Sequence, residues 1–285
     1  MKIFDPQVSS LVTDALNEDI GGFDITTDAF VCREDPYIEC EVIAKDDAVF
    51  CGSDVFSLVF KILDWNGNEI KFFVKDGSSV KKFQKVISIK AKASIVLYGE
   101  RTALNFLQHL SGIATAAALA VRELSGLKTK VLDTRKTLPG LRLLQKYAVR
   151  VGGAENHRFD LSSGILIKDN HIKLAGGIKK ALDMIRSYNS GFNQKIEVEV
   201  TNINEVAGAL DAGAEIIMLD NMGINEMKEA VNYIHGRALV EASGNITINN
   251  MREVAETTGV DYISMGSLTN AAKPADFSLN FNRRF

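Results

Sequence analysis

Basic side chains gather in three short segments in the second half of the chain. The segments are Arg135-Lys136, His157-Arg158 and the single residue Lys168. The planar guanidinium of arginine meets a carboxylate or phosphate with two hydrogen bonds, whereas lysine acts as a point charge. The net charge of the whole chain is only -3, so local clusters, not the whole molecule, would attract an anion. We therefore expect a site for a small anion with several negative groups.

Acidic and small residues occupy comparable places further along the chain. Glu199 and Asp220 stand at the ends of apolar segments. Carboxylates in such places can accept hydrogen bonds from sugar hydroxyls, hold Mg²⁺ or stabilise a developing positive charge. Ser243-Gly244 offers a turn whose backbone N–H groups can bind phosphate, and Gly266 ends a further apolar segment. Together these residues predict a ligand that carries phosphate as well as other anionic groups.

The elements that position these residues alternate between strand and helix from residue 130 onward. Short apolar strands that alternate with helices indicate a parallel sheet buried on both faces. Six such units without a central break favour a barrel over an open sheet, and barrel enzymes carry their sites at the carboxyl ends of the strands. We expect strands at 131–132, 165–167, 196–200, 216–219, 238–240 and 262–264, and helices at 141–149, 177–187, 203–211, 225–233 and 249–257.

The first part of the chain has a different pattern, which is typical of an α+β domain. The period-two alternation at 277–281 suits a half-exposed strand, so we expect that segment to return to the N-terminal sheet. The predicted division is a sandwich domain of residues 1–110, rejoined by 275–285, and a barrel of about six strands at 111–274. In the N-terminal part we expect helices at 5–17 and 53–63 and strands at 37–44, 69–74 and 86–91.

A long helix is predicted between the two parts, from residue 94 to 124, with a break near Ser111-Gly112. Arg101, Asn105 and His109 lie four residues apart and therefore share one face of this otherwise apolar helix. The spacing alone leaves two interpretations equally open. The row is either a buried polar network or a face that is presented to a binding site.

Composition excludes several classes of protein. A chain of 285 residues, 46% of them hydrophobic, is long enough for one large core or two smaller ones. No segment reaches 18 uninterrupted apolar residues, and the N-terminus has no apolar leader segment, so we expect neither membrane spanning nor secretion. Three cysteines without metal-binding spacing suggest reduced thiols in a cytoplasmic protein. Neither a dinucleotide motif nor a P-loop occurs, and no nucleic-acid partner is expected.

The longer motifs around these residues resemble those of one enzyme family. They are similar to the quinolinate phosphoribosyltransferases (nicotinate-nucleotide pyrophosphorylase, carboxylating), in the family's order and over nearly the whole chain. The motifs are Gly99–Asn105, Ser111–Thr115, Asp133–Thr137, Pro139–Arg142, Lys146–Arg150, Asn156–Arg158, Leu166–His171, Glu197–Val200, Met218–Asn221 and Glu241–Asn245. Phe23, Ser163 and Asn270 depart from the pattern, and Asn270 puts one side-chain contact to phosphate in doubt.

The resemblance implies a fold, a reaction and a cofactor. The fold is an N-terminal sandwich domain followed by an incomplete α/β barrel, with active sites shared across a homodimer. In the reaction, quinolinate and phosphoribosyl diphosphate give nicotinate mononucleotide, CO₂ and pyrophosphate, with Mg²⁺ as cofactor. This is a pentosyl transfer in NAD biosynthesis, and its partners are small molecules.

The resemblance also implies roles for the charged residues. Arg135, His157, Arg158 and Lys168 would hold the two ring carboxylates, and Arg101 would come from the partner subunit. The ribose and Mg²⁺ would lie beside Glu199 and Asp220. The remaining assignments are Lys136 and Lys168 for the diphosphate, and Ser243, Gly244 and Gly266 for the 5′-phosphate; Lys136, Lys168, Glu199 and Asp220 form the expected catalytic set.

Two alternatives stay open at this point. One is a protein of the same fold that acts on another substrate, in which we would expect the Asn156–Arg158 and Lys168–His171 motifs to be lost. The other is a non-catalytic barrel that binds an anionic metabolite. Glu199 and Asp220 weigh against it, because simple anion binding would not place carboxylates beside the anion.

Overall fold

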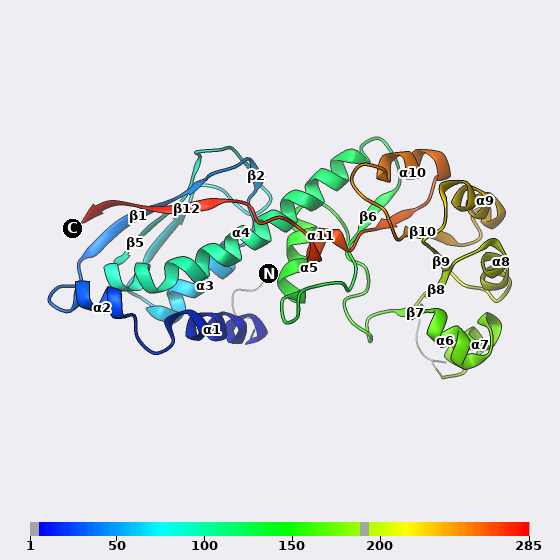
Figure 1. Cartoon of the computed structure of the whole chain (residues 1–285), viewed down its shortest axis with the longest axis horizontal. Helices are drawn as coiled ribbons and strands as arrows, with labels where there is room; N and C mark the ends of the chain where they lie inside the picture. Colours follow the sequence, from blue (N-terminus) through cyan, green and yellow to red (C-terminus); the bar gives the residue numbers. More distant parts are fainter. Residues whose placement is uncertain (1–5, 189–193, 285) are drawn as a thin grey trace. The chain divides into compact units, whose positions relative to one another are not determined.

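An antiparallel sheet of four strands forms the centre of the N-terminal part of the computed structural model, which describes residues 6–188 and 194–284 (Figure 1). The strand order is β12-β1-β5-β3. Val42 of β1 pairs with Leu279 of β12, so the predicted return of the C-terminal segment to this sheet is confirmed. The bounds are β1 Tyr37–Ala44, β3 Glu69–Phe72, β5 Lys85–Lys92 and β12 Phe277–Arg284, and a separate pair joins β2 Ala48–Val49 to β4 Ser79–Val80.

Alternate residues of β1 are buried, as expected for a strand with one covered face. The helices are α1 Pro6–Ile20, α2 Ile25–Val31 and α3 Ser53–Leu63. Aromatic side chains fill the core beside the sheet. The rings of Phe56 and Phe60 in α3 lie 5.3 Å apart, and the ring of Phe50, which follows β2, lies 6.2 Å from that of Phe277 of β12. Sequence patterns missed α2, whose start is fixed by the side chain of Asp24, which accepts hydrogen bonds from the N–H groups of Thr26 and Thr27.

Helix α4 runs without interruption from Ala93 to Glu123, so the predicted break near Ser111-Gly112 is wrong. Both residues serve close packing instead. A Cβ atom at position 112 would lie 2.1 Å from the carbonyl oxygen of Lys273, and the Ser111 hydroxyl donates to the carbonyl of Cys51 at 3.1 Å. The helix is long and apolar enough to cross a membrane, but its side chains at Leu104, Leu107 and Leu110 are fully buried, as in the core helix of a soluble protein.

Six parallel strands form the second sheet, in the order β6-β11-β10-β9-β8-β7. Strands β7 to β10 each pair with the next strand in the chain, and β11 pairs with β6. The strands β6 and β7 do not pair with each other, so the barrel stays open between them. The predicted incomplete barrel of six parallel strands is therefore confirmed. The bounds are β6 Lys130–Leu132, β7 Ile165–Ile167, β8 Ile196–Val200, β9 Ile216–Asp220, β10 Leu239–Ser243 and β11 Tyr262–Ser264.

The free edge of β6 is occupied by a short loop segment. Leu132 forms an isolated parallel bridge with Glu155, whose N–H donates to the carbonyl of Val131 and whose carbonyl accepts from the N–H of Asp133. The helices after the strands are α5 Arg142–Val151, α6 Asp169–Ala175, α7 Ile178–Tyr188, α8 Ile203–Asp211, α9 Ile224–Ile234, α10 Met251–Thr258 and α11 Ser267–Asn270. The sequence missed α6, which begins directly at the charged residues expected to follow β7.

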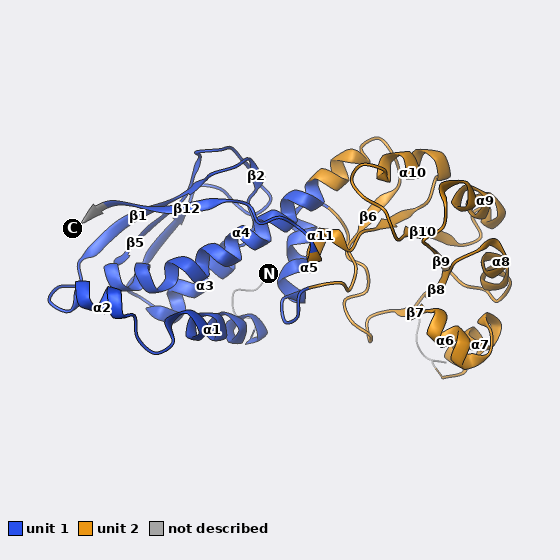
Figure 2. Cartoon of the chain, in the orientation of Figure 1, with its two compact units in different colours: residues 1–118, 138–153, 271–285 blue, residues 119–137, 154–270 orange. Residues whose placement is uncertain are grey.

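The chain divides into two compact units, coloured in Figure 2. The first comprises residues 1–118, 138–153 and 271–285, and the second comprises 119–137 and 154–270. Each compact unit is therefore built from segments that are not continuous in the sequence. The domain limits at 110/111 and 274/275 stay a prediction.

Candidate active site

A cavity of about 550 Å³ opens at the carboxyl ends of the barrel strands. Lys168 follows β7, Glu199 lies one residue before the end of β8, and Asp220 and Ser243 end β9 and β10. The register explains why these side chains meet, because Asp220 pairs directly with Ser243 across neighbouring strands. The predicted site residues that line this cavity are Arg135, Lys136, His157, Arg158, Lys168, Glu199, Asp220, Ser243 and Gly244.

Two arginines in the cavity have unused hydrogen-bonding capacity. The Nε atoms of Arg135 and Arg158 are buried and find no hydrogen-bond partner within residues 6–188 and 194–284. Burial, and then the positive charge of Arg135, lower the pKa of the Arg158 guanidinium below its ordinary value. Buried donors without acceptors and adjacent like charges are both unfavourable. An anion bound between the two guanidinium groups would remove both penalties.

Lys168 and Glu199 form an ion pair on the same cavity wall. Glu199 is largely buried and Lys168 is about half exposed. The main chain of Lys168 is fixed at the start of α6, where its N–H donates to Nδ1 of His171 at 2.9 Å. The pair presents one positive and one negative group side by side. Such a pair can exchange its internal contact for an anionic group and a hydroxyl of a ligand.

Asp220 and Asn221 at the end of β9 lie tightly against Gly244, which follows β10. The N–H of Asn221 donates to the carbonyl of Ser243 at 2.9 Å, and its side-chain amide donates to Asp220 at 2.8 Å. A Cβ atom at position 244 would lie 2.2 Å from Oδ1 of Asn221, and Gly244 has a φ of +85°. Both the space and the backbone conformation therefore require glycine. Ser243 and Gly244 are thus the small residues at the predicted phosphate position.

Gly266 does not line the cavity, but the side chain of Lys136 packs against it. A Cβ atom at position 266 would lie 2.9 Å from Cδ of Lys136. The main chain of Lys136 is held by two hydroxyls: its N–H donates to Oγ1 of Thr134 at 3.0 Å, and its carbonyl accepts from Oγ1 of Thr269 at 2.9 Å. Glycine at 266 thus allows the alkyl part of Lys136 to lie across it, with the ammonium group exposed at the mouth.

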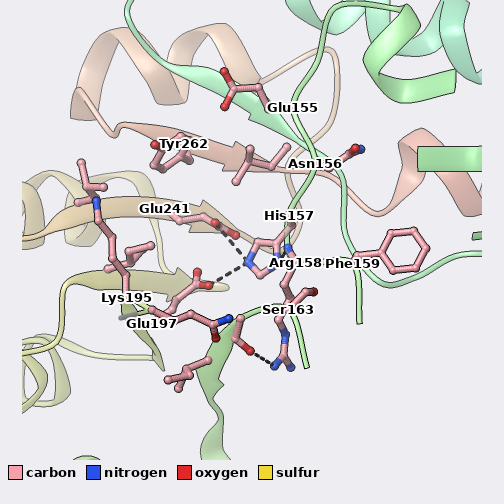
Figure 3. Close-up of a pocket in the computed structure, with 16 residues that line it drawn as sticks. Glu155, Asn156, His157, Arg158, Phe159, Ser163, Lys195, Glu197, Glu241 and Tyr262 are labelled. Atoms are coloured by element: carbon pink, nitrogen blue, oxygen red, sulfur yellow. Dashed lines mark hydrogen bonds and ion pairs between the residues drawn. The ribbon is translucent and has the colours of Figure 1, made fainter. Parts of the chain in front are cut away.

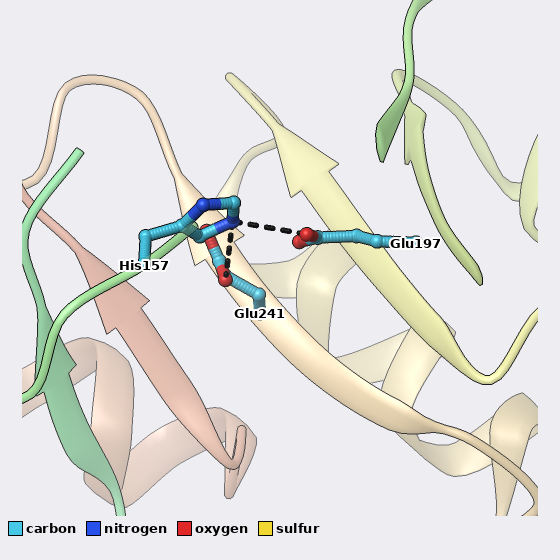
Figure 4. Close-up of side chains that lie close together, drawn as sticks. All are labelled: His157, Glu197 and Glu241. Carbon is cyan, nitrogen blue, oxygen red and sulfur yellow. Dashed lines mark hydrogen bonds and ion pairs between the residues drawn. The ribbon is translucent and has the colours of Figure 1, made fainter. Parts of the chain in front are cut away.

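The interior of the barrel holds a buried cluster of His157, Glu197 and Glu241 (Figure 4). Nε2 of His157 lies 2.9 Å from Oε2 of Glu197 and 3.7 Å from Oε2 of Glu241. Burial, and then the charge of Glu197, raise the pKa of the Glu241 carboxyl above its ordinary value. A second cavity, of about 440 Å³, borders the same three side chains on the side of the strand starts (Figure 3).

The donor sets in the barrel differ in what they can hold. Glu199 and Asp220 offer carboxylate oxygens beside hydroxyl and amide groups, and such hard oxygen donors fit Mg²⁺. Ligand atoms of His157, Glu197 and Glu241 also lie within 4.8 Å of one another. That cluster already pairs its imidazole with a carboxylate in a hydrogen bond. We therefore place the candidate Mg²⁺ ligands at Glu199 and Asp220.

Arg101 belongs to the first compact unit, on an exposed part of α4. Along the same face Asn105 is exposed, whereas the ring of His109 contacts the side-chain amide of Gln145 at 2.8 Å. Burial lowers the pKa of His109, which favours its neutral form. The polar row thus combines the two sequence interpretations: one end forms an internal network and the other faces outward. The role of Arg101 in a shared site stays a prediction.

Sequence reasoning did not select Glu241 as a site residue, although it noted its place near a strand end. Leu239, Glu241 and Ser243 alternate along β10 and therefore face the same side as one another. β10 continues to Ser243 and does not end at 240 as expected, so Glu241 lies inside the strand. A charged residue directly after an apolar run was the signal that could have identified it. Asn221, Asn245 and Thr134 also line the cavity and were not selected.

Comparisons with known proteins agree with this geometry. Residues 24–111 match the family model for the N-terminal domain of quinolinate phosphoribosyl transferase, and residues 113–280 match the model for its C-terminal domain. The chain is 39% identical to a probable nicotinate-nucleotide pyrophosphorylase [carboxylating] of Bacillus subtilis, over 96% of this chain and 93% of the relative. It is 37% identical to the human nicotinate-nucleotide pyrophosphorylase [carboxylating], over 95% and 91%.

Solved structures show the same likeness. The nicotinate-nucleotide pyrophosphorylase of Francisella tularensis superposes with a TM-score of 0.91 at 41% identity, covering 97% of this chain and 96% of that one. The corresponding protein of Ehrlichia chaffeensis superposes with a TM-score of 0.92 at 38% identity, covering 99% and 100%. The likeness thus covers both compact units.

Proposed function

Because this chain belongs to the quinolinate phosphoribosyltransferase family and has that family's activity in NAD biosynthesis, we propose that the cavity at the strand ends is its active site. The observation that carries the assignment is the pair Arg135 and Arg158, whose buried Nε atoms have no partner in the described part of the chain. Quinolinate has two carboxylates on adjacent ring carbons, and two guanidinium groups together with Lys168 would match them.

Other residues of the cavity suit the phosphoribosyl group. Glu199 and Asp220 would accept hydrogen bonds from the ribose hydroxyls and hold Mg²⁺, which when bound neutralises charge on the diphosphate. Ser243 and Gly244, with Gly266 behind Lys136, would surround the 5′-phosphate. Lys136 and Lys168 would contact the diphosphate. Carboxylates beside the ribose would also stabilise positive charge at its anomeric carbon as pyrophosphate leaves.

The reaction needs no nucleophile from the protein. The ring nitrogen of quinolinate forms a bond to the anomeric carbon while the bond to pyrophosphate breaks. The ring then carries a positive charge and accepts the electron pair of the adjacent carbon–carboxylate bond, so that CO₂ leaves and a proton replaces it. The protein contributes position and charge, and good orientation alone supplies about 7–11 kcal/mol.

Three further assignments belong to this proposal. The enzyme acts as a homodimer in which Arg101 of one subunit completes the other subunit's quinolinate site. Mg²⁺ is the cofactor, and the compartment is the cytoplasm, in keeping with three free cysteines, two of them buried.

A turnover assay tests the proposed function directly. Purified protein is mixed with quinolinate, phosphoribosyl diphosphate and Mg²⁺, and CO₂ and nicotinate mononucleotide are measured. Equal release of both is expected. Product from nicotinate but not from quinolinate would instead assign another substrate, and tight binding without any product would identify a non-catalytic binding protein.

A further inference from the structure

The polar cluster inside the barrel occupies a place where barrel enzymes usually pack apolar side chains. Its members come from three segments: His157 from the loop beside β6, Glu197 from β8 and Glu241 from β10 (Figure 4). Their side chains are 10%, 7% and 2% exposed. Burying three ionisable groups is unfavourable unless they satisfy one another. The cluster therefore needs a function that offsets its cost.

Both ring nitrogens of His157 are already engaged within the protein. Nδ1 accepts a hydrogen bond from the N–H of Arg158 at 2.8 Å, so it carries no proton. Nε2 lies 2.9 Å from a carboxylate oxygen of Glu197, so its proton is donated there. The ring is thus neutral, with one defined tautomer. No ring nitrogen is left for a direct contact with a carboxylate of the substrate.

The charged groups around the ring support this arrangement. Arg135 and Arg158 line the same cavity as the ring, Asp133 accepts the backbone N–H of His157 at 2.9 Å, and Glu197 accepts from Nε2. Glu241 stands 3.7 Å from the same Nε2, and its burial favours the neutral carboxyl. Oε1 of Glu241 is buried without a partner among the residues that the structure describes. The carboxyl thus fills the space beside the ring and closes it on that side.

We propose that Glu197 and Glu241 are positioning residues, which hold the imidazole of His157 in one tautomer and thereby fix Arg158 at the quinolinate site. His157 acts through the main chain of Arg158, whose guanidinium is held on its other side by the carbonyl of Gly164 at 3.0 Å. The proposal rests on the proposed function, because it takes Arg158 to bind a ring carboxylate. It gives the buried carboxylates a role in substrate affinity, although neither touches the substrate.

Steady-state kinetics of four variants test the proposal. Glu197→Leu and Glu241→Leu each remove a carboxyl group that lies beside the imidazole ring of His157. Each is expected to raise the KM for quinolinate about tenfold. The KM for phosphoribosyl diphosphate is expected to change less than about twofold. Glu241→Gln and Glu197→Gln keep the size and one acceptor oxygen, so they should restore most of the loss. The matched control is Thr129→Val, which removes a buried hydrogen bond to the carbonyl of Val260 in the same unit.

A spectroscopic measurement reports the ring itself. In protein labelled with ¹⁵N-histidine, we expect one protonated and one unprotonated ring nitrogen for His157 at neutral pH, assigned by comparison with His157→Gln. The Glu197→Leu variant, which removes the acceptor of the Nε2 proton, should show a mixture of tautomers. A doubly protonated ring in the native enzyme, or leucine variants with a native quinolinate KM, would overturn the proposal.

The two proposals fail in different ways. If the proposed function is wrong, native protein forms no product from quinolinate. If only the positioning role is wrong, native protein forms product. The leucine variants then either keep the native quinolinate KM or raise both substrate KM values equally, as general destabilisation in Thr129→Val would.

Discussion

A Cβ atom on Gly244 would lie 2.2 Å from Oδ1 of Asn221, so these two residues at neighbouring strand ends can coexist only because one has no side chain. Asn221 itself adopts a left-handed conformation, with a φ of 55°. The turn that we assign to the 5′-phosphate therefore depends on one glycine.

Replacement of Gly244 by alanine should weaken phosphoribosyl diphosphate binding. The methyl group must displace the Asn221 side chain and occupy a left-handed conformation, which costs about 1 kcal/mol or more. We expect the KM for phosphoribosyl diphosphate to rise at least about fivefold, with a smaller effect on quinolinate. Initial rates at varied concentrations of each substrate measure both values. Gly236→Ala, at another left-handed glycine with no atom within 4 Å of an added Cβ, controls for backbone strain alone.

Replacement of Glu199 by glutamine should lower turnover more than quinolinate affinity. The change removes the negative charge that we place beside the ribose and the partner of Lys168. A loss of a charge that acts on the transition state reduces kcat on the order of 10²-fold. Single-turnover measurements of CO₂ release check this. An unchanged rate would remove Glu199 from the ribose side.

Replacement of Glu241 by glutamine should change how stability depends on pH. The folded state raises the pKa of Glu241 above its ordinary value of 4.5, so the folded protein holds this proton more tightly than the unfolded chain does. The native free energy of unfolding should therefore be greatest below that value and fall as pH rises through the raised pKa.

The neutral glutamine side chain lacks this pH dependence. The free energy of unfolding of Glu241→Gln minus that of the native protein should increase by about 1 kcal/mol or more between pH 5 and pH 8. Denaturant titrations at several pH values measure it. Glu229→Gln, at an exposed position of α9, should leave the difference constant. A difference for Glu241→Gln that shrinks with pH would contradict the burial argument.

Arg101→Ala should abolish activity, although Arg101 lies outside the barrel unit. If each site combines two subunits, mixing this variant with Lys168→Ala should restore about a quarter of native activity. Half of randomly formed dimers are mixed, and each mixed dimer holds one intact site. Subunit exchange is shown separately by native mass spectrometry. Exchange without recovery would indicate that Arg101 acts within its own chain.

Strand positions followed from the sequence because the barrel strands are short apolar runs with abrupt polar ends. The strands at 165–167, 196–200 and 262–264 lie where they were expected. The exception at β10 has the same physical cause. Glu241 has the charge of a strand end but points into the barrel, so the strand continues two residues beyond it. Local pattern cannot distinguish a solvated carboxylate from a carboxyl that is buried beside a histidine distant in the sequence.

The charged residues of the site were also recognisable, because nine of the predicted residues line one cavity. What the sequence could not show was which of them contact each other. One ring nitrogen of His157 is hydrogen-bonded to Glu197, forty residues away in the sequence, and the other accepts a hydrogen bond from the main chain of Arg158. The continuity of α4 at Gly112 likewise depends on Lys273, far along the chain.

The loop that carries Asn156, His157 and Arg158 begins as the segment that pairs with β6. Unpaired strand edges in proteins invite association with other chains and aggregation. Here the Glu155 backbone satisfies the edge of β6 through two hydrogen bonds. One peptide segment therefore protects the edge of the sheet and carries the arginine that we assign to the substrate. Changes to its length would compromise solubility and catalysis together, so this loop has little freedom to vary.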